Sequence, residues 1–226
     1  MVSGRVQAAL MSTLALVGAV ASAQQAGVVG TLHNLSVSGP GAIKALGETE
    51  VCKFCHIPHN PIVPQPLWGH ALSRVPSYAV PQMRRQGQAW EPPQPDGASR
   101  LCLSCHDGTV ALGDLGRGRQ VAMAGREGLS PGQQGFLGTD LSGSHPVSFV
   151  VPDEAAAPAD PGDDMGLKPL AAIRADGQVR LDGAGKMQCT TCHDPHSDRN
   201  YQPGVVPHFW VKSAVTEVCQ TCHELR

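Results

Sequence analysis

Hydrophobic positions are concentrated near the start of the chain. Residues 6–20 form its longest apolar run, which follows a short basic start and precedes the small residues Ala21, Ser22 and Ala23. This order is typical of a secretory signal peptide, and the run is too short for a stable membrane-spanning helix. We therefore expect residues 1–23 to be removed and the remaining chain to be exported without a membrane span.

After residue 23 the apolar positions lie in short segments that Gly and Pro interrupt. The chain contains 26 glycines and 19 prolines, and both residues break helical and strand patterns. We expect short helices around the cysteine motifs described below, little sheet and mostly coil. One hairpin is predicted over residues 171–181, turning at Asp176 and Gly177. Residues 153–170, whose first part is rich in Asp, Ala and Pro, are predicted to form a linker or long loop.

The composition does not supply an ordinary hydrophobic core. Only four Phe, three Trp and two Tyr occur in 226 residues. A chain with so few large apolar side chains needs disulfides, metals or large cofactors to build its interior. The formal net charge is −2, and there is no basic patch with interleaved aromatics, which argues against a nucleic-acid partner.

All eight cysteines fall into one pattern, Cys-x-x-Cys-His, which occurs four times. This pattern is the attachment signature of c-type haem. Two thiols three positions apart can each form a thioether to a haem vinyl group, and the next histidine coordinates the iron as the proximal ligand. We number the motifs as sites one to four: Cys52, Cys55 and His56; Cys102, Cys105 and His106; Cys189, Cys192 and His193; Cys219, Cys222 and His223.

Four Cys-x-x-Cys pairs are also compatible with two zinc ribbons or with a disulfide scaffold. Neither alternative requires a histidine directly after each pair, and covalent haem attachment suits an exported chain. We therefore predict four haem c groups and no structural disulfide. Because the haems would replace the missing aromatic core, the haem-free chain is predicted to be largely unfolded.

Six further histidines are available as distal iron ligands. Methionine is the alternative ligand type, but none of the methionines after residue 23 has a recognisable context, so bis-histidine ligation is predicted throughout. His59 and His196 each stand three residues after a proximal histidine, in Cys-His-x-Pro-His, and are expected to reach a haem other than their own. For every candidate the alternative is an ordinary surface histidine. The remaining candidates are His33, His70 and His145, and His208 is the weakest.

The motifs form an internal repeat. The longer form, Cys-x-x-Cys-His-x-Pro-His, occurs at sites one and three, and a shorter motif follows each of them at sites two and four. This alternation predicts a first haem-pair region at residues 24–152 and a second at residues 171–226, joined by the linker.

These features together resemble the tetrahaem c-type cytochromes with doubled Cys-x-x-Cys-His motifs that occur on bacterial surfaces, some of which polymerise into extracellular conducting filaments. The resemblance rests on the haem motifs and on the short segments around His33, His70 and His145, and it spans nearly all of the mature chain. It implies a multihaem cytochrome c fold whose core is built by four haems. It also implies five distal ligands for four irons: His33, His59, His70, His145 and His196. The chain departs from the pattern at Gly69, where Asn is expected.

The predicted function is electron transfer through closely spaced haems, in the periplasm or at the cell surface. The expected partners are redox proteins or extracellular electron acceptors, and the haem propionates would favour basic partners. A small multihaem oxyanion reductase is the alternative, and it requires one iron with an open position. A homo-oligomer or filament is compatible with conduction, and in one version of this hypothesis His33 ligates a haem of the adjoining subunit.

Overall fold

The computed structural model describes residues 27–85, 88–152 and 165–225. The predicted signal peptide at residues 1–23 and the Asp- and Pro-rich part of the predicted linker, residues 153–164, lie outside the described residues. Among the residues that are described, no helix is long and apolar enough to cross a bilayer.

Short helices carry all four cysteine pairs. Residues three positions apart lie on the same side of a helix, so each of these helices presents its two thiols together. Site one lies on the 3-10 helix η2 (Val51–Phe54) and its C-cap Cys55, site two on α1 (Gly97–His106), site three on α3 (Cys189–Cys192) and site four on α4 (Val215–Cys222). The other helices in the described ranges are η1 (Val28–Gly30) and α2 (Leu170–Arg174).

The strands form two-stranded antiparallel pairs. The pairs are β1 (Lys44–Ala45) with β4 (Met123–Ala124), β2 (Met83–Arg85) with β3 (Gln88–Trp90), and β5 (Met165–Leu167) with β6 (His223–Leu225). Most of the remaining described chain is turn or coil. The predicted low content of regular structure, with short helices around the motifs, is therefore confirmed.

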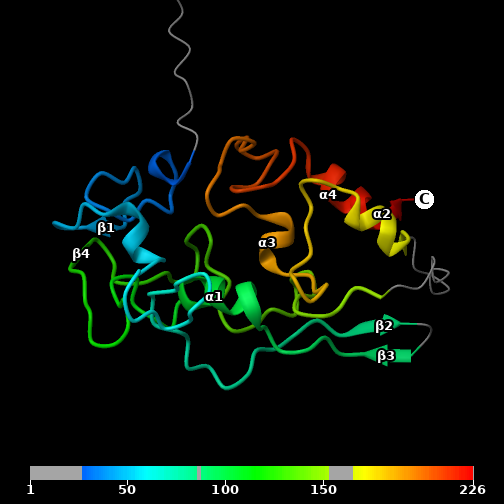
Figure 1. Cartoon of the computed structure of the whole chain (residues 1–226), viewed down its shortest axis with the longest axis horizontal. Coiled ribbons are helices and arrows are strands. Elements are labelled where there is room, and N and C mark those ends of the chain that lie inside the picture. Colours follow the sequence, from blue (N-terminus) through cyan, green and yellow to red (C-terminus); the bar gives the residue numbers. More distant parts are fainter. Residues whose placement is uncertain (1–26, 86–87, 153–164, 226) are drawn as a thin grey trace, which may run out of the picture.

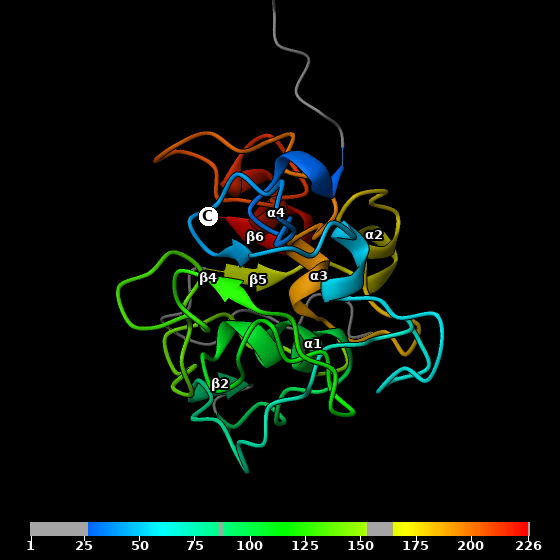
Figure 2. The same ribbon diagram turned by 90° about the vertical axis from the view of Figure 1, so that its left-hand side faces the viewer.

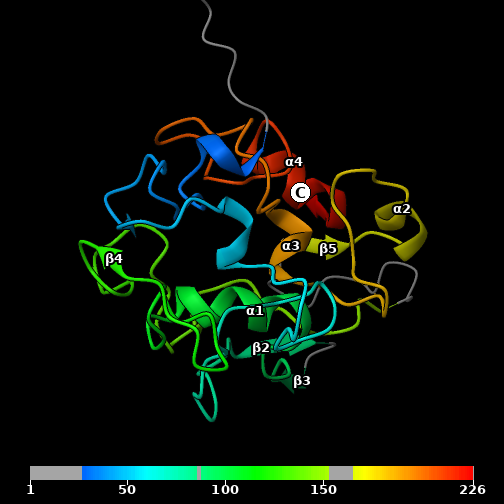
Figure 3. The ribbon, with the colours of Figure 1, turned by 60° about the vertical axis from the view of Figure 1, so that its left-hand side comes forward.

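Helices α1 and α3 lie side by side in the middle of the molecule, as the three views agree (Figure 1, Figure 2, Figure 3). The segment that contains β1 and β4 lies on one side of them, and α2 packs with α4 on the other (Figure 1). Since α1 belongs to the first predicted haem-pair region and α3 to the second, the two regions are in direct contact. Their division into two regions stays a prediction.

The apolar interior of the described chain consists of small clusters. The largest contains Leu170 and Ile173 of α2, the second surrounds Phe54 of η2, and the third surrounds Leu103 of α1. Three motif cysteines lie in or against these clusters: Cys55, Cys192 and Cys222. The apolar side chains therefore gather around the attachment points instead of forming one continuous core.

The predicted hairpin over residues 171–181 is wrong. The segment begins with α2, because Leu170 and Ile173 lie on one helical face and are buried in the largest cluster. Asp176 then turns the chain: its Oδ1 accepts hydrogen bonds of 2.9 Å from the backbone N–H groups two and three residues later. The turn signal at Asp176 was correct, but it follows a helix instead of joining two strands.

Candidate haem-binding sites

The attachment cysteines of successive motifs lie near one another. All eight are free thiols. Burial raises the pKa of Cys105, and the nearby Cys55 of site one raises it further. The thiols of Cys102 and Cys189 interact, which raises the pKa of Cys102 and lowers that of Cys189, so sites two and three adjoin. Burial, and then the thiols of site four, raise the pKa of Cys192 to about 12. Successive sites are therefore neighbours in space.

A buried polar network holds α1 against α3, between sites two and three. Gln188 lies directly before α3 and is 2 % exposed. Its Oε1 accepts hydrogen bonds from the backbone N–H (3.1 Å) and the hydroxyl (2.6 Å) of Ser99. Its Nε2 donates to Asp96 at 3.1 Å and to Asp182 at 3.0 Å. An ion pair between Lys186 and Asp96 lies beside this network. The spacing of the two motifs is thus set by buried side chains.

Three of the four motif histidines use Nδ1 to contact a backbone carbonyl. A ring nitrogen that faces a carbonyl oxygen carries the proton, so Nε2 keeps its lone pair for a metal. Metal-binding histidines commonly have this arrangement, which fixes the orientation of the ring. The Nδ1–oxygen distances are 2.7 Å from His56 to Pro66, 2.6 Å from His106 to Gly135 and 3.1 Å from His193 to His208.

Three motif histidines also face a second histidine. Because a metal lies about 2 Å from an imidazole nitrogen and the ring centroid about 1.1 Å beyond it, an iron between two rings separates their centroids by about 6 Å. The observed separations are 6.0 Å for His56 and His196, 5.9 Å for His106 and His33, and 6.3 Å for His223 and His145. These pairs have the spacing that bis-histidine ligation of haem iron requires, and each contains one predicted distal candidate.

The five distal candidates differ in their surroundings. The Nδ1–carbonyl distances are 3.2 Å from His33 to Pro195, 2.9 Å from His145 to Pro146 and 2.8 Å from His70 to Ala71. These three rings present Nε2 in the same way as the motif histidines. His196 differs, because its side chain is 64 % exposed and its Nδ1 lies 3.6 Å from the carboxylate of Asp194. His59 is exposed.

Burial keeps several of these rings neutral. It lowers the pKa of His33 to about 4, and it also lowers the pKa of His70 and of His193. A histidine must be unprotonated at one nitrogen to bind a metal. Each of these rings is therefore neutral at neutral pH even without a metal, and its unprotonated nitrogen can bind one.

Site three has no equivalent histidine pair. The ring of His193 meets the indole of Trp210 edge-on, with 5.0 Å between centroids, and within the described part of the chain no distal candidate faces it. His59 and His70 are the candidates left over from the three pairs. His70 is fully buried and its Nε2 lies 3.5 Å from Sγ of Cys105. It therefore lies beside site two, where Cys105 approaches Cys55 of site one, whereas His59 is at the surface.

The loop that leads from His59 to His70 fits a bound haem. The indole Nε1 of Trp68 and the guanidinium Nε of Arg119 are buried without a hydrogen-bond partner. Trp68 packs edge-on against His56, and Arg119 binds the carbonyl of Asn60 at 3.4 Å. Both orphaned donors thus flank site one, where the propionate groups of a haem would satisfy them. Buried N–H donors of this kind suit the carboxylate oxygens of haem propionates.

The departure from the family pattern at Gly69 has a local steric cause. A Cβ at this position would lie 2.4 Å from Cγ1 of Ile57 and 3.0 Å from its Cβ. Ile57 directly follows His56 and is buried in the second cluster, so any side chain at position 69 would displace it.

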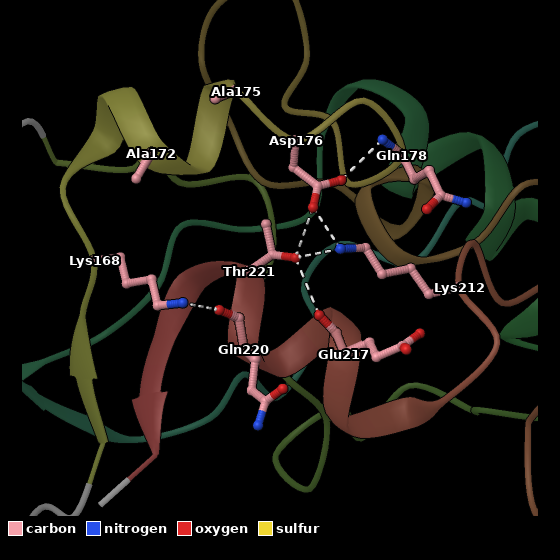
Figure 4. A pocket seen from close by; sticks show the side chains of 9 residues that line it. All are labelled: Lys168, Ala172, Ala175, Asp176, Gln178, Lys212, Glu217, Gln220 and Thr221. Carbon is pink, nitrogen blue, oxygen red and sulfur yellow. Dashed lines mark hydrogen bonds and ion pairs between the residues drawn. The ribbon is translucent and has the colours of Figure 1, made fainter.

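Site four is held in place by a charged network beside an open cavity of about 600 Å³ (Figure 4). Lys212 forms an ion pair with Asp176 and donates to the hydroxyl of Thr221 at 2.9 Å. Lys168 donates to the carbonyl of Gln220 at 2.6 Å. Because Gln220 and Thr221 stand between the two cysteines of this motif, these bonds fix site four against α2.

His208, the weakest distal candidate, has a different role. Its ring stacks on Tyr201 with 3.5 Å between centroids, and its Nδ1 contacts the carboxylate of Asp198 at 2.5 Å. The residues that follow, Phe209 and Trp210, lie against two histidines of the candidate sites. No sequence pattern predicts a role for Asp198, Phe209 or Gln188. The aromatic doublet at positions 209–210, in a chain with few aromatics, was the one available signal.

Comparison with protein-family models matches residues 183–225 to the doubled CXXCH motif. The matched segment contains sites three and four. Among curated proteins, none matches the chain significantly. The doubled motif indicates covalent binding of haem c and a role in electron transfer. Together with the paired histidines, the match supports a multihaem c-type cytochrome.

Proposed function

We propose that the protein is an exported electron carrier that holds four covalently bound haems, one at each Cys-x-x-Cys-His motif, with histidine on both sides of the irons. The observation that carries this proposal is the set of three histidine pairs, whose ring centroids are 5.9–6.3 Å apart. Each pair combines a motif histidine with a histidine from a distant part of the sequence. Ordinary core histidines would not repeat this spacing at three motifs.

Bound haem supplies the chemistry, which is a reversible one-electron change at iron. The polypeptide attaches the haems, orients their histidine ligands and sets the order of the sites. Its cysteines anchor the groups, its carbonyl-bound Nδ1 atoms fix the imidazoles, and the succession of sites one to four provides a path through the molecule. Histidine on both sides favours low potentials relative to methionine ligation.

The proposed ligand assignments follow the observed pairs. His196 serves site one, His33 serves site two and His145 serves site four. His196 would thus bind at a site other than its own, as expected for the Cys-His-x-Pro-His motif. The contact of His33 with His106 of the same chain favours ligation within the chain over ligation of an adjoining subunit. Filament formation and a cell-surface location rest on the family resemblance alone.

Mass spectrometry and redox titration of the purified mature protein test the central proposal. We expect an intact mass increased by four haems and reversible reduction of all four irons at low potential. A protein with fewer than four haems, or with zinc in the motifs, would refute it.

The alternative function, a small multihaem reductase, would have its open iron at site three. If His193 had no distal partner, its iron would be open, as a small multihaem reductase requires. We assign His70 to this position because it is the buried candidate that the three observed pairs leave over, and its Nδ1 faces a backbone carbonyl.

The variant His70→Ala tests this assignment, with the exposed His59→Ala as its matched control. We expect His70→Ala to convert one low-spin iron to high spin, and His59→Ala to leave all irons low-spin. High-spin iron in the unmodified protein would instead favour the reductase.

A further inference from the structure

The segment at residues 208–211 wraps around the proximal histidine of site three. The carbonyl of His208 accepts the Nδ1 proton of His193 at 3.1 Å. Trp210 packs edge-on against the same ring at 5.0 Å, and the N–H of Val211 donates to the carbonyl of Cys192 at 3.0 Å. Both the orientation and the tautomer of His193 therefore depend on where this segment lies.

The same segment also touches the distal ligand proposed for site two. The ring of Phe209 stacks on His33, with centroids 4.1 Å apart and planes inclined by 13°. His33 in turn faces His106 at 5.9 Å. Phe209 is 8 % exposed, so the stack is enclosed by protein. Adjacent residues of one short segment thus support ligands of two neighbouring irons.

Phe209 holds this place in an unfavourable backbone conformation. Its φ is 61°, in the left-handed region that bulky residues rarely adopt. Such strain persists only when the surroundings fix the residue. Here the N–H of Phe209 donates to Oδ1 of Asp198 at 2.7 Å, and its carbonyl accepts from the N–H of Asp194 at 2.7 Å. The other oxygen of Asp198 contacts His208, so one carboxylate holds both residues.

We propose that Phe209, held by Asp198, is a positioning residue shared by sites two and three, and that it sets the ligand orientation at both irons together. This inference rests on the proposed function, because it takes His33 and His193 as iron ligands. The orientation of an axial imidazole and its hydrogen bonding tune the iron that it binds. Moving the segment therefore changes the two centres together.

The test uses the full-length holoprotein, with electron paramagnetic resonance during a redox titration. The variants are Phe209→Leu, which removes the stacking ring, and Phe209→Tyr, which keeps it. Trp90→Leu, an aromatic substitution on β3, is the matched control. The spectra of His33→Ala and His145→Ala identify the signals of sites two and four.

We expect Phe209→Leu to shift two of the four low-spin signals and their potentials, the site-two signal among them, and to leave site four unchanged. Phe209→Tyr keeps the signals and potentials of the unmodified protein, and Trp90→Leu changes none of them. Unchanged signals in Phe209→Leu, a shift at one site only, or equal shifts at all four sites would overturn the inference.

A second pair of variants, at Asp198, tests the inference if Phe209→Leu does not fold. Asp198→Asn retains an oxygen acceptor for the N–H of Phe209, whereas Asp198→Ala does not. We expect the same two signals to move, and to move further in Asp198→Ala. No shift in either variant would contradict the role of Asp198. If the unmodified protein lacked four low-spin haems, the proposed function would fail first, and the two failures are thereby distinguishable.

Discussion

At the scale of single residues, the two ring nitrogens of histidine have different partners. In His56, His106 and His193, and in the distal candidates His33, His70 and His145, Nδ1 faces a backbone carbonyl. This leaves Nε2 as the electron-pair donor. His208 lacks this arrangement because its Nδ1 contacts a carboxylate. The partner of Nδ1 does not identify a ligand by itself, because Nδ1 of His196, the ligand proposed for site one, also lies beside a carboxylate, that of Asp194.

His145→Ala tests one pair directly. Its ring lies 6.3 Å from that of His223, so its loss opens one coordination position at site four. We expect one of four low-spin irons to become high-spin in the electron paramagnetic resonance spectrum, with the other three unchanged. External imidazole should restore the low-spin signal, because the cavity left by the side chain can accept it. Four low-spin irons in the variant would show that His145 is not a ligand.

At the scale of elements, the cysteine spacing predicts where the helices are but not how they pack. Short helices were expected around the motifs, and η2, α1, α3 and α4 carry the four cysteine pairs. The contact between α1 and α3 was not predictable, because it depends on Ser99 and Gln188, which are 89 residues apart in sequence. The hairpin prediction failed for a related reason, since burial of Leu170 and Ile173 favoured a helix before the turn.

Gln188→Ala tests whether the network between sites two and three stabilises the fold. The substitution leaves the buried N–H and hydroxyl of Ser99 without their acceptor. Each unsatisfied group costs about 1–3 kcal/mol, so we expect the free energy of unfolding to fall by about 2–4 kcal/mol. Denaturant unfolding of the holoprotein measures this. The exposed Gln202→Ala serves as control, with an expected change within about 0.5 kcal/mol. Equal effects of the two variants would contradict the role of the network.

The charged network at site four makes stability depend on pH. Burial alone would raise the pKa of Asp176, but hydrogen bonds from Lys212 and from two backbone N–H groups outweigh it and hold the pKa below its ordinary value. A carboxylate with a lowered pKa in the folded state stabilises the fold above its unfolded pKa of about 3.9. This stabilisation is lost as the pH falls through the folded pKa.

Asp176→Asn should therefore lower the thermal midpoint at pH 7, and the difference from the unmodified protein should shrink as the pH falls below about 4. Thermal unfolding over a pH series measures both quantities. A difference that does not change with pH would show that the charge of Asp176 contributes nothing.

At the scale of the whole molecule, the interior depends on more than the chain. The small clusters gather around the motif cysteines, and the polypeptide has few aromatics to join them. The shortage of aromatic residues, the fold class and the motif chemistry could all be derived from the sequence. The pairing of His33 with His106 could not, because 73 residues separate them and no local pattern links them.

The haem-free chain should lack stable tertiary structure. With no haem to cover the cluster surfaces, burial cannot offset the conformational entropy of a Gly- and Pro-rich chain. Replacing all eight cysteines by alanine prevents covalent attachment, and we expect this variant to be rapidly digested by protease and to show no cooperative unfolding. A folded, protease-resistant haem-free chain would contradict this account of the core.

The account as a whole depends on histidine pairs that hold four irons. Quantitative electron paramagnetic resonance of the oxidised, purified mature protein tests this most directly. The account predicts four low-spin ferric ions per chain and no high-spin signal. A high-spin signal that amounts to one iron per chain or more would contradict it.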